Sequence, residues 1–438
     1  MSQTLPARDA PFNFAALVGD VSCFLVGMAF LDTSTALPAL VTKLGGTPTV
    51  LAALAALRQA AYYLPQLVVA HRLQNRTRFQ PFLLKVCGFG RIWLFVAAIV
   101  IFLVGRTLPG LALAALVVAY TLSWLGDGMG GVPWTAIVGR AVPLERRGRL
   151  FATIQVISGV GRFGVGAAVT AILSEKYFAF PASGGLLVLG CAVFLLLSWI
   201  FLALIREPAP QKPLIEDEAL ATEAALGFVG YLRALPVHFR ARPDVAMLAL
   251  VQVLTTAASS SAPFLLGHAS RHTTGGLPLS IAGTFLMVQT GGLLLLAPVL
   301  GGITDRIGPR RTLIVLLWLS LGCTATAVVG GLRFGAPLAL PLFFAAYFCL
   351  GAASDAWTTI TNYLLEAVPD QKQQATFVAI LNASTAPALL LPLGLGLLVS
   401  SNGSATGAFG AASLLLLAGL IAAHRLPDTR QNTAISSF

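Results

Sequence analysis

The chain has 438 residues, of which 57% are hydrophobic and only 10% are charged, and its mean hydropathy is +0.83. Because a soluble domain carries about 25% charged residues, this composition excludes a water-soluble globular protein and predicts an integral membrane protein. The net charge of +11 comes from bases in short loops, without the clustered aromatics of a nucleic-acid-binding module, so nucleic acid is not an expected partner.

Twelve apolar stretches are long enough to cross a lipid bilayer, because a membrane-spanning helix needs roughly 20 mostly apolar residues. In chain order they cover residues 12–40, 48–70, 81–104, 109–139, 148–173, 183–205, 244–268, 279–301, 311–332, 337–365, 373–400 and 405–424. An all-α integral membrane protein with 12 transmembrane helices is therefore predicted.

The basic residues indicate how these spans are oriented. Most of the 28 Lys and Arg residues lie in loops on the side of the N-terminus, while the other side holds Lys43, Arg106, Lys176, Arg271 and Arg333. Since cytoplasmic loops are enriched in Lys and Arg, both termini are predicted to be cytoplasmic. Short loops without a soluble domain favour a bacterial cytoplasmic (inner) membrane.

A spaced pattern of Thr, Ala-Val-Pro and Phe occurs twice, at 135–151 and at 361–377, and its prolines are 226 residues apart. The chain is therefore interpreted as a duplication. Between the two copies lies a stretch that is rich in proline and charge. The predicted division is an N-terminal six-helix half at 1–205, a cytoplasmic linker at 206–243 and a C-terminal six-helix half at 244–438.

The loop between the eighth and ninth spans, residues 301–311, reads Gly-Gly-Ile-Thr-Asp-Arg-Ile-Gly-Pro-Arg-Arg. In a duplicated chain of twelve spans, this loop resembles the signature loop of the major facilitator superfamily (MFS) of secondary transporters. The resemblance implies two pseudo-symmetric six-helix bundles that work by alternating access, with the substrate site between them near the middle of the membrane.

The same resemblance implies a gate on the cytoplasmic side. In the family, the glycines of this loop let two helices approach closely, and its carboxylate meets a helix N-terminus and nearby arginines. The gating residues are expected to be Gly301, Asp305, Arg306 and Gly308, with Arg147 or Arg149 as partner of the carboxylate. The corresponding early loop, 71–78, departs from the pattern, because Asn75 stands where the family has Asp.

Charges inside spans are candidates for function, because a charge at the bilayer centre costs about 2.5–3.5 kcal/mol on insertion scales. Together with polar and aromatic residues on the same helix faces, they predict a binding site for substrate and ion. Its residues are Asp32, Arg58, Tyr62, Tyr63, Trp124, Asp127, Trp134, Arg162, Gln252, Asp355 and Asn362. Their depth in the membrane predicts that Asp127 pairs with Arg162 and that Asp32 pairs with Arg58.

Three further expectations concern individual charges. Arg91 lies in a span that, by the resemblance, does not line the central cavity. Asp20, near the cytoplasmic face, is either a solvated residue or a proton carrier. Asp355 has no arginine inside the membrane in its own half, and it is predicted to carry the coupling proton. Since both cavity arginines are expected to be paired with aspartates, the charge of the substrate stays open.

The predicted function is secondary active transport of a small organic solute, coupled to H+ by symport or by antiport and efflux, in a monomer without a cofactor or metal. The alternatives are an uncoupled facilitator and a non-transporting MFS-like sensor or assembly protein. The sequence contains no G-x-S-x-G, H-E-x-x-H or P-loop motif, so an enzyme is not expected.

Overall fold

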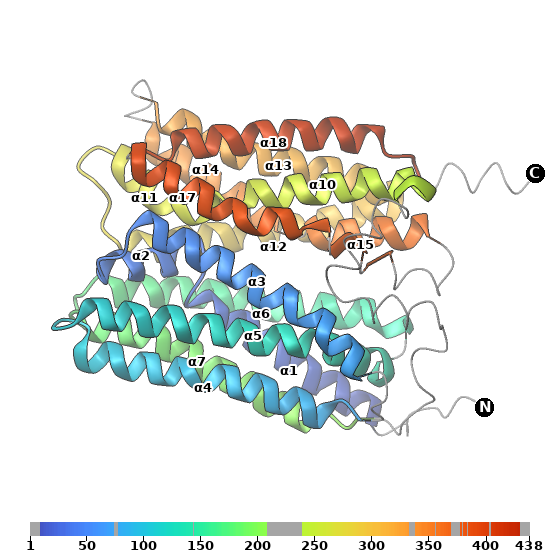
Figure 1. Ribbon diagram of the computed structural model, residues 1–438, viewed down its shortest axis with the longest axis horizontal. Coiled ribbons are helices and arrows are strands. Elements are labelled where there is room, and N and C mark those ends of the chain that lie inside the picture. The colour runs from blue at the N-terminus through green and yellow to red at the C-terminus, as the bar shows by residue number, and fades with distance from the viewer. Residues whose placement is uncertain are drawn as a thin grey trace, which may run out of the picture. The chain divides into compact units, whose positions relative to one another are not determined.

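The computed structural model of the chain describes residues 9–73, 78–142, 144–207, 239–332, 338–354, 356–368, 377–378, 380–382, 384–402 and 404–429. Every regular element in these ranges is a helix (Figure 1). The first part contains α1 (Asp9–Ala29), α2 (Ala36–Lys43), α3 (Pro48–Leu73), α4 (Gln80–Val104), α5 (Pro109–Ala141), α6 (Leu144–Leu173) and α7 (Ala182–Leu204). The second part contains α10 (Pro243–Ser259), η1 (Ala262–Phe264), α11 (Leu265–His272), α12 (Ile281–Ile307), α13 (Pro309–Gly330), α14 (Ala339–Ala352), α15 (Ala356–Ala367), η3 (Ala386–Leu390), α17 (Leu391–Asn402) and α18 (Thr406–Arg425).

Among the described residues, nine helices are long and apolar enough to cross a membrane, and the apolar helices Ala339–Ala352 and Ala388–Ser401 are shorter. The predicted second span is also helical and forms α3. These helices are consistent with twelve spans and confirm the all-α membrane fold that the composition predicts.

The first, seventh and tenth predicted spans are not continuous helices, and the tenth is divided between α14 and α15. The first is interrupted between α1 and α2, where the Asp32 side chain accepts hydrogen bonds from the backbone N–H of Ser34 at 3.0 Å and from the hydroxyl of Thr35 at 3.0 Å. Short polar side chains that bond to nearby backbone compete with the helical pattern. The seventh span is interrupted between α10 and η1, where three serines precede Pro263.

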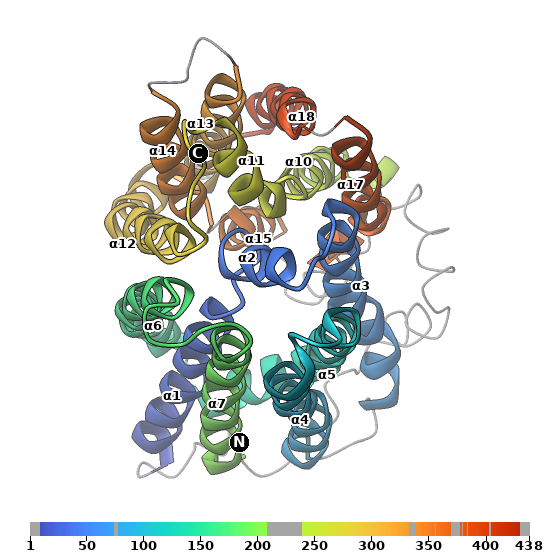
Figure 2. The same cartoon turned by 90° about the vertical axis from the view of Figure 1, so that its left-hand side faces the viewer.

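The chain forms two compact units. The first comprises Met1–Thr47, Leu57–Ala225 and Leu279–Met287, and the second comprises Pro48–Ala56, Leu226–Pro278 and Val288–Phe438. In the first unit α7 packs against both α1 and α4, and α4 packs against α5 (Figure 2). In the second unit α18 packs against both α10 and α13, and α13 packs against α14 and α15. The same packing order in both units follows the internal duplication of the sequence.

Glu207 ties together one end of the first unit. Its two carboxylate oxygens accept hydrogen bonds from the backbone N–H groups of Phe79 and Gln80, at 2.9 and 3.0 Å, where α4 begins. Arg140, near the end of α5, lies 3.5 Å from the same carboxylate. A carboxylate is favoured at this place because the first N–H groups of a helix have no partner within the helix.

Candidate functional site

A buried ion pair joins α4 to α5. The Arg91 guanidinium donates to Asp127 Oδ1 at 3.0 Å, and the two side chains are only 7% and 9% exposed. Arg91 also donates to the backbone oxygen of Leu195 at 3.0 Å and to the hydroxyl of Ser198 at 3.1 Å, both in α7. One arginine therefore links three helices.

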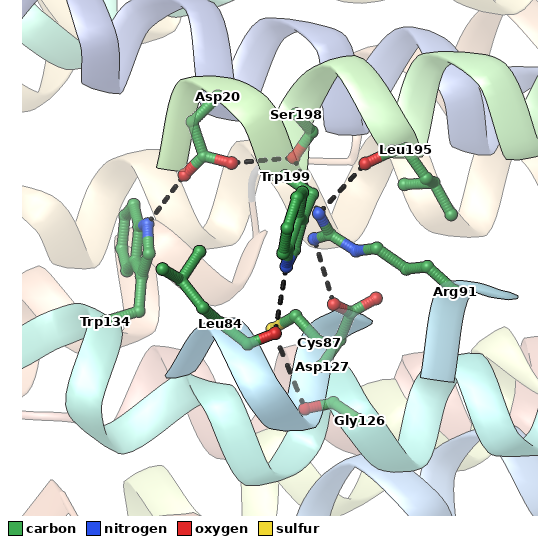
Figure 3. A network of polar contacts seen from close by, with 10 residues as sticks. All are labelled: Asp20, Leu84, Cys87, Arg91, Gly126, Asp127, Trp134, Leu195, Ser198 and Trp199. Atoms are coloured by element: carbon green, nitrogen blue, oxygen red, sulfur yellow. Dashed lines mark hydrogen bonds and ion pairs between the residues drawn. The ribbon is translucent and has the colours of Figure 1, made fainter. Parts of the chain in front are cut away.

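Asp20 extends this network to α1 (Figure 3). Its Oδ1 accepts a hydrogen bond from the Ser198 hydroxyl at 2.6 Å, and its Oδ2 accepts one from Trp134 Nε1 at 3.0 Å. Asp20 is 4% exposed. Of the two alternatives considered for this residue, a solvated side chain is therefore wrong. We refer to Asp20, Arg91, Asp127 and Ser198 as the buried charge network.

Glycines allow α4 and α5 to approach closely beside this network. A Cβ atom at Gly90 would lie 2.6 Å from the backbone oxygen of Leu122, and one at Gly126 would lie 2.5 Å from that of Val86. Only residues without a side chain fit such backbone contacts. Since Gly90 precedes Arg91 and Gly126 precedes Asp127, the close contact also places these two charges next to each other.

An aromatic cluster lies around Trp124 in α5. Its ring contacts Phe24 and Tyr62 edge-on, with centroid distances of 6.2 and 5.8 Å, and Tyr62 contacts Tyr63 in the same way at 5.1 Å. The guanidinium carbon of Arg58 lies 5.1 Å from the centroid of the Trp124 ring. Arg58, Tyr62, Tyr63 and Trp124 are therefore neighbours, as their helical spacing in the sequence suggests.

The structure corrects both predicted ion pairs. Asp127 pairs with Arg91 instead of Arg162. The Asp32 carboxylate accepts hydrogen bonds from Ser34 and Thr35, and its charge acts on Arg162 through space. Within the described part of the chain, Arg58 has no ion-pair partner and contacts Trp124. The prediction used depth in the membrane alone, which does not determine the direction in which a side chain points from its helix.

Trp134 has a different neighbour from the one expected. It was predicted to form part of the aromatic wall of the substrate site, but its indole N–H is bound to Asp20. Its ring packs against the apolar core that contains Leu17, Leu83 and Ile137.

The candidates of the second unit lie on two helices. Gln252 in α10 is 4% exposed, and its side-chain oxygen has no hydrogen-bond partner among the described residues. Asn362 in α15 is exposed. Asp355, the predicted carrier of the coupling proton, lies outside the described residues.

The predicted gate loop is mostly helical. Helix α12 continues to Ile307 and α13 begins at Pro309, so Gly301, Asp305 and Arg306 lie on the last turns of α12, where all three are exposed. A Cβ atom at Gly301 would meet nothing within 4 Å, so this glycine does not permit a close approach of helices there. Gly308 alone forms the turn, with φ of 89° and ψ of 160°, a conformation that is essentially restricted to glycine.

The two arginines that were expected to pair with the gate carboxylate, Arg147 and Arg149, both lie in α6. Arg147 in α6 donates to the backbone oxygens of Gly139 and Val142 at 2.8 and 3.2 Å, where α5 ends. Arg149 is exposed.

Sequence reasoning left Arg91, Asp20 and Ser198 out of the site. Arg91 was set aside because the resemblance implies that its span does not line the cavity, but it is the centre of the buried charge network. The signal that could have found it is the glycine-rich segment 126–131, which surrounds Asp127 and predicts a close helix neighbour. Ser198 carries no signal of its own, because single serines are common in membrane helices.

The buried charge network holds two carboxylates and one guanidinium. When both carboxylates are ionised, the network carries one excess negative charge in a medium of low dielectric constant, and binding one proton removes it. Asp127 has the direct contact to Arg91, whereas the donors that Asp20 has among the described residues, Ser198 and Trp134, are neutral. Asp20 is therefore the carboxyl group best placed to take up and release a proton.

Comparison with known proteins gives a family match and several similar folds. The model of the Major Facilitator Superfamily matches residues 21–316. A point mutant of the nucleoside transporter NupG superposes with a TM-score of 0.67 at 12% identity, covering 94% of this chain and 99% of the NupG chain. A POT family transporter in complex with a thioalcohol-conjugated peptide superposes with a TM-score of 0.67 at 15% identity, covering 97% of each chain.

A third similar structure is a point mutant of the E. coli fucose:proton symporter FucP, with a TM-score of 0.59 and 15% identity. The match covers 96% of this chain and 100% of the FucP chain. At these identities the likeness concerns the fold. No curated protein matches the sequence.

Proposed function

Because the chain belongs to the major facilitator superfamily, whose model matches more than half of its residues, we propose that it transports a small organic solute across a membrane with coupling to protons. The observation that carries the coupling is the buried charge network, in which Asp20 and Asp127 share the single cation Arg91. A buried group whose charge must change is suited to link proton binding to a conformational change.

The geometry around Asp20 accommodates both protonation states. In the ionised state Oδ1 accepts from the Ser198 hydroxyl, which itself accepts from Arg91. When Oδ1 is protonated it donates to the oxygen of Ser198, because a hydroxyl group can both donate and accept. Trp134 is a donor only, so it keeps its bond to Oδ2 in both states. The proton can therefore bind and leave without loss of a hydrogen bond.

We assign the substrate contacts to the residues predicted from the sequence that lie near Trp124, namely Arg58, Tyr62 and Tyr63, with Asp32, Arg162, Gln252 and Asn362 as further contacts. Asp355 stays a second candidate for the coupling proton. We further propose alternating access in a monomer whose termini are both cytoplasmic, in a bacterial cytoplasmic membrane. The distribution of Lys and Arg among the loops supports this orientation.

The test is uptake of pooled labelled metabolites and drugs into vesicles that contain the purified full-length protein, with and without an imposed pH gradient. A coupled transporter accumulates a solute only while the gradient persists, and the direction of the gradient that drives uptake separates symport from antiport. A protonophore serves as the control, because it removes the gradient and leaves the protein intact.

The same experiment distinguishes the alternatives. A solute that equilibrates at the same rate with and without the gradient would show facilitated diffusion. If no pool moves while the protein is folded and inserted, transport itself is contradicted, and a sensor or assembly role would be favoured.

A further inference from the structure

Two arginines in the helices of the first unit have no direct counter-ion among the described residues. In the described parts of the chain, neither Arg58 nor Arg162 forms a hydrogen bond or an ion pair. The carboxylate that was expected to pair with Arg162, Asp127, is bound to Arg91. The expected pairing of both arginines with aspartates, which would give no indication of the charge of the substrate, is therefore not formed.

One hydrogen-bond donor beside Trp124 is buried and has no acceptor among the described residues. It is Arg58 Nε. The Arg58 guanidinium lies over the Trp124 ring, and the Tyr120 ring contacts Trp124 at a centroid distance of 6.3 Å. Because a buried charged donor without an acceptor is costly, the guanidinium indicates that an acceptor is missing there.

The remaining Arg58 nitrogens also have no acceptor in the part of the chain that the structure describes, but they are not buried. A ligand can therefore reach the outer edge of the Arg58 guanidinium while the face of the guanidinium packs on the Trp124 ring. A guanidinium with a free edge binds the two oxygens of a carboxylate or phosphate in parallel.

Charge in this region also favours an anion. Arg58 lies over Trp124 without a carboxylate partner in the described part of the chain, whereas the Asp32 carboxylate accepts hydrogen bonds from Ser34 and Thr35. In a medium of low dielectric constant an unpaired positive charge is costly unless an opposite charge enters.

The aromatic rings define the rest of the ligand. Phe24 and Tyr62 contact Trp124 edge-on, and Tyr63 contacts Tyr62 in the same way. Aromatic edges and faces both contact flat apolar groups favourably. A ligand that matches the whole cluster has an anionic head and an apolar body.

We propose that the transported solute is an organic anion, whose carboxylate or phosphate group is bound by the free edge of the Arg58 guanidinium, and whose flat apolar or aromatic body lies against Tyr62 and Tyr63. This inference rests on the proposed transport function, and it narrows the substrate to one chemical class.

The test compares probes that share one ring system and differ in charge. Binding to the purified full-length protein in detergent is measured by titration calorimetry for naphthoate, naphthyl phosphate, naphthylmethanol and naphthylmethylammonium. The two anions are expected to bind at least about 10-fold more tightly than the neutral and cationic probes, the factor that about 1.4 kcal/mol of charge-assisted bonding gives. The relative affinity of the two anions then separates a carboxylate from a phosphate ligand.

Variants identify the residue that is responsible. Arg58→Gln is expected to weaken anion binding about 10-fold or more, and Arg58→Lys to retain part of it, because the charge remains while the two-pronged geometry is lost. Arg106→Gln is the matched control, since Arg106 is an exposed arginine at the end of α4, and it is expected to leave binding unchanged. Elution from size-exclusion chromatography confirms that each variant is folded.

Equal binding of neutral or cationic probes, absence of anion binding, or unchanged anion affinity in Arg58→Gln would overturn the proposal. The transport function is judged separately by uptake of charged and uncharged pools into vesicles. Uptake confined to neutral or cationic solutes would contradict the anion specificity alone, whereas absence of uptake from every pool would contradict transport.

Discussion

Arg91 of α4 donates a hydrogen bond to the carboxylate of Asp127 in α5 across 3.0 Å, with both side chains shielded from solvent. Through Ser198 the same guanidinium is connected to Asp20 of α1. The Arg91–Asp127 contact therefore joins α4 to α5 and, through Ser198, connects both helices to the proposed proton site at Asp20.

The first prediction concerns the two carboxylates of this network. Asp127→Asn is expected to lower the thermal unfolding midpoint more than Asp20→Asn, because Arg91 loses the negative charge of its direct partner, and a hydrogen bond between charged groups contributes about 1.5–3 kcal/mol. Asp20→Asn keeps the Arg91–Asp127 pair, and its amide can still donate to Ser198 and accept from Trp134. Unfolding of both variants is followed in detergent by tryptophan fluorescence. Equal midpoints would show that the direct contact contributes little.

The second prediction concerns the close packing of α4 and α5. Gly126→Ala is expected to reduce the yield of folded protein, because its Cβ would lie 2.5 Å from the backbone oxygen of Val86. Gly164→Ala in α6 is the control, since nothing lies within 4 Å of a Cβ there. Monodisperse yield from membranes is the measurement, and a Gly126→Ala variant that behaves like the control would contradict the close contact.

The third prediction concerns the turn between α12 and α13. Gly308→Ala is expected to cost about 1–3 kcal/mol, because the backbone conformation at this position is strained for any residue with a side chain. Gly301→Ala, seven residues earlier on the exposed end of α12, is expected to be neutral or slightly stabilising, since alanine favours helix more than glycine does. Thermal unfolding of both variants checks this, and the reverse order of stability would contradict the assigned turn.

The fourth prediction concerns Glu207. Glu207→Gln removes the negative charge that binds the N-terminus of α4 and Arg140, and it is expected to lower stability by about 1–2 kcal/mol. Glu175→Gln is the comparison, because Glu175 is 39% exposed and pairs with Lys43 at the surface, where an ion pair contributes about 0–1 kcal/mol. Similar losses in the two variants would mean that Glu207 does not hold the helix end.

Much of the fold follows from the sequence. Apolar length and the repeated Ala-Val-Pro segments are sufficient for a duplicated all-helical membrane protein, and the structure has the same packing order in both units. The interruptions of the first and seventh spans were not predicted, because hydropathy averages over residues such as Asp32 and Pro263 whose local bonding and geometry end a helix.

The candidate site was predicted in part. Arg58, Tyr62, Tyr63 and Trp124 are neighbours because they lie on matching helix faces, which periodicity can detect. The partner of Asp127 could not be predicted in this way. It depends on which helix lies next to α5, and that choice is made by backbone contacts at Gly90 and Gly126.

Proton movement measured together with solute transport tests the central claim most directly. The external pH of weakly buffered vesicles is recorded when a transported solute is added, for the unmodified protein, for Asp20→Asn and for Asp355→Asn. The account predicts a solute-dependent pH change in the unmodified protein that is lost in Asp20→Asn, while this variant still exchanges labelled for unlabelled solute, because asparagine mimics the protonated carboxyl group. A pH change that persists undiminished in Asp20→Asn would contradict the claim that the buried charge network carries the coupling proton.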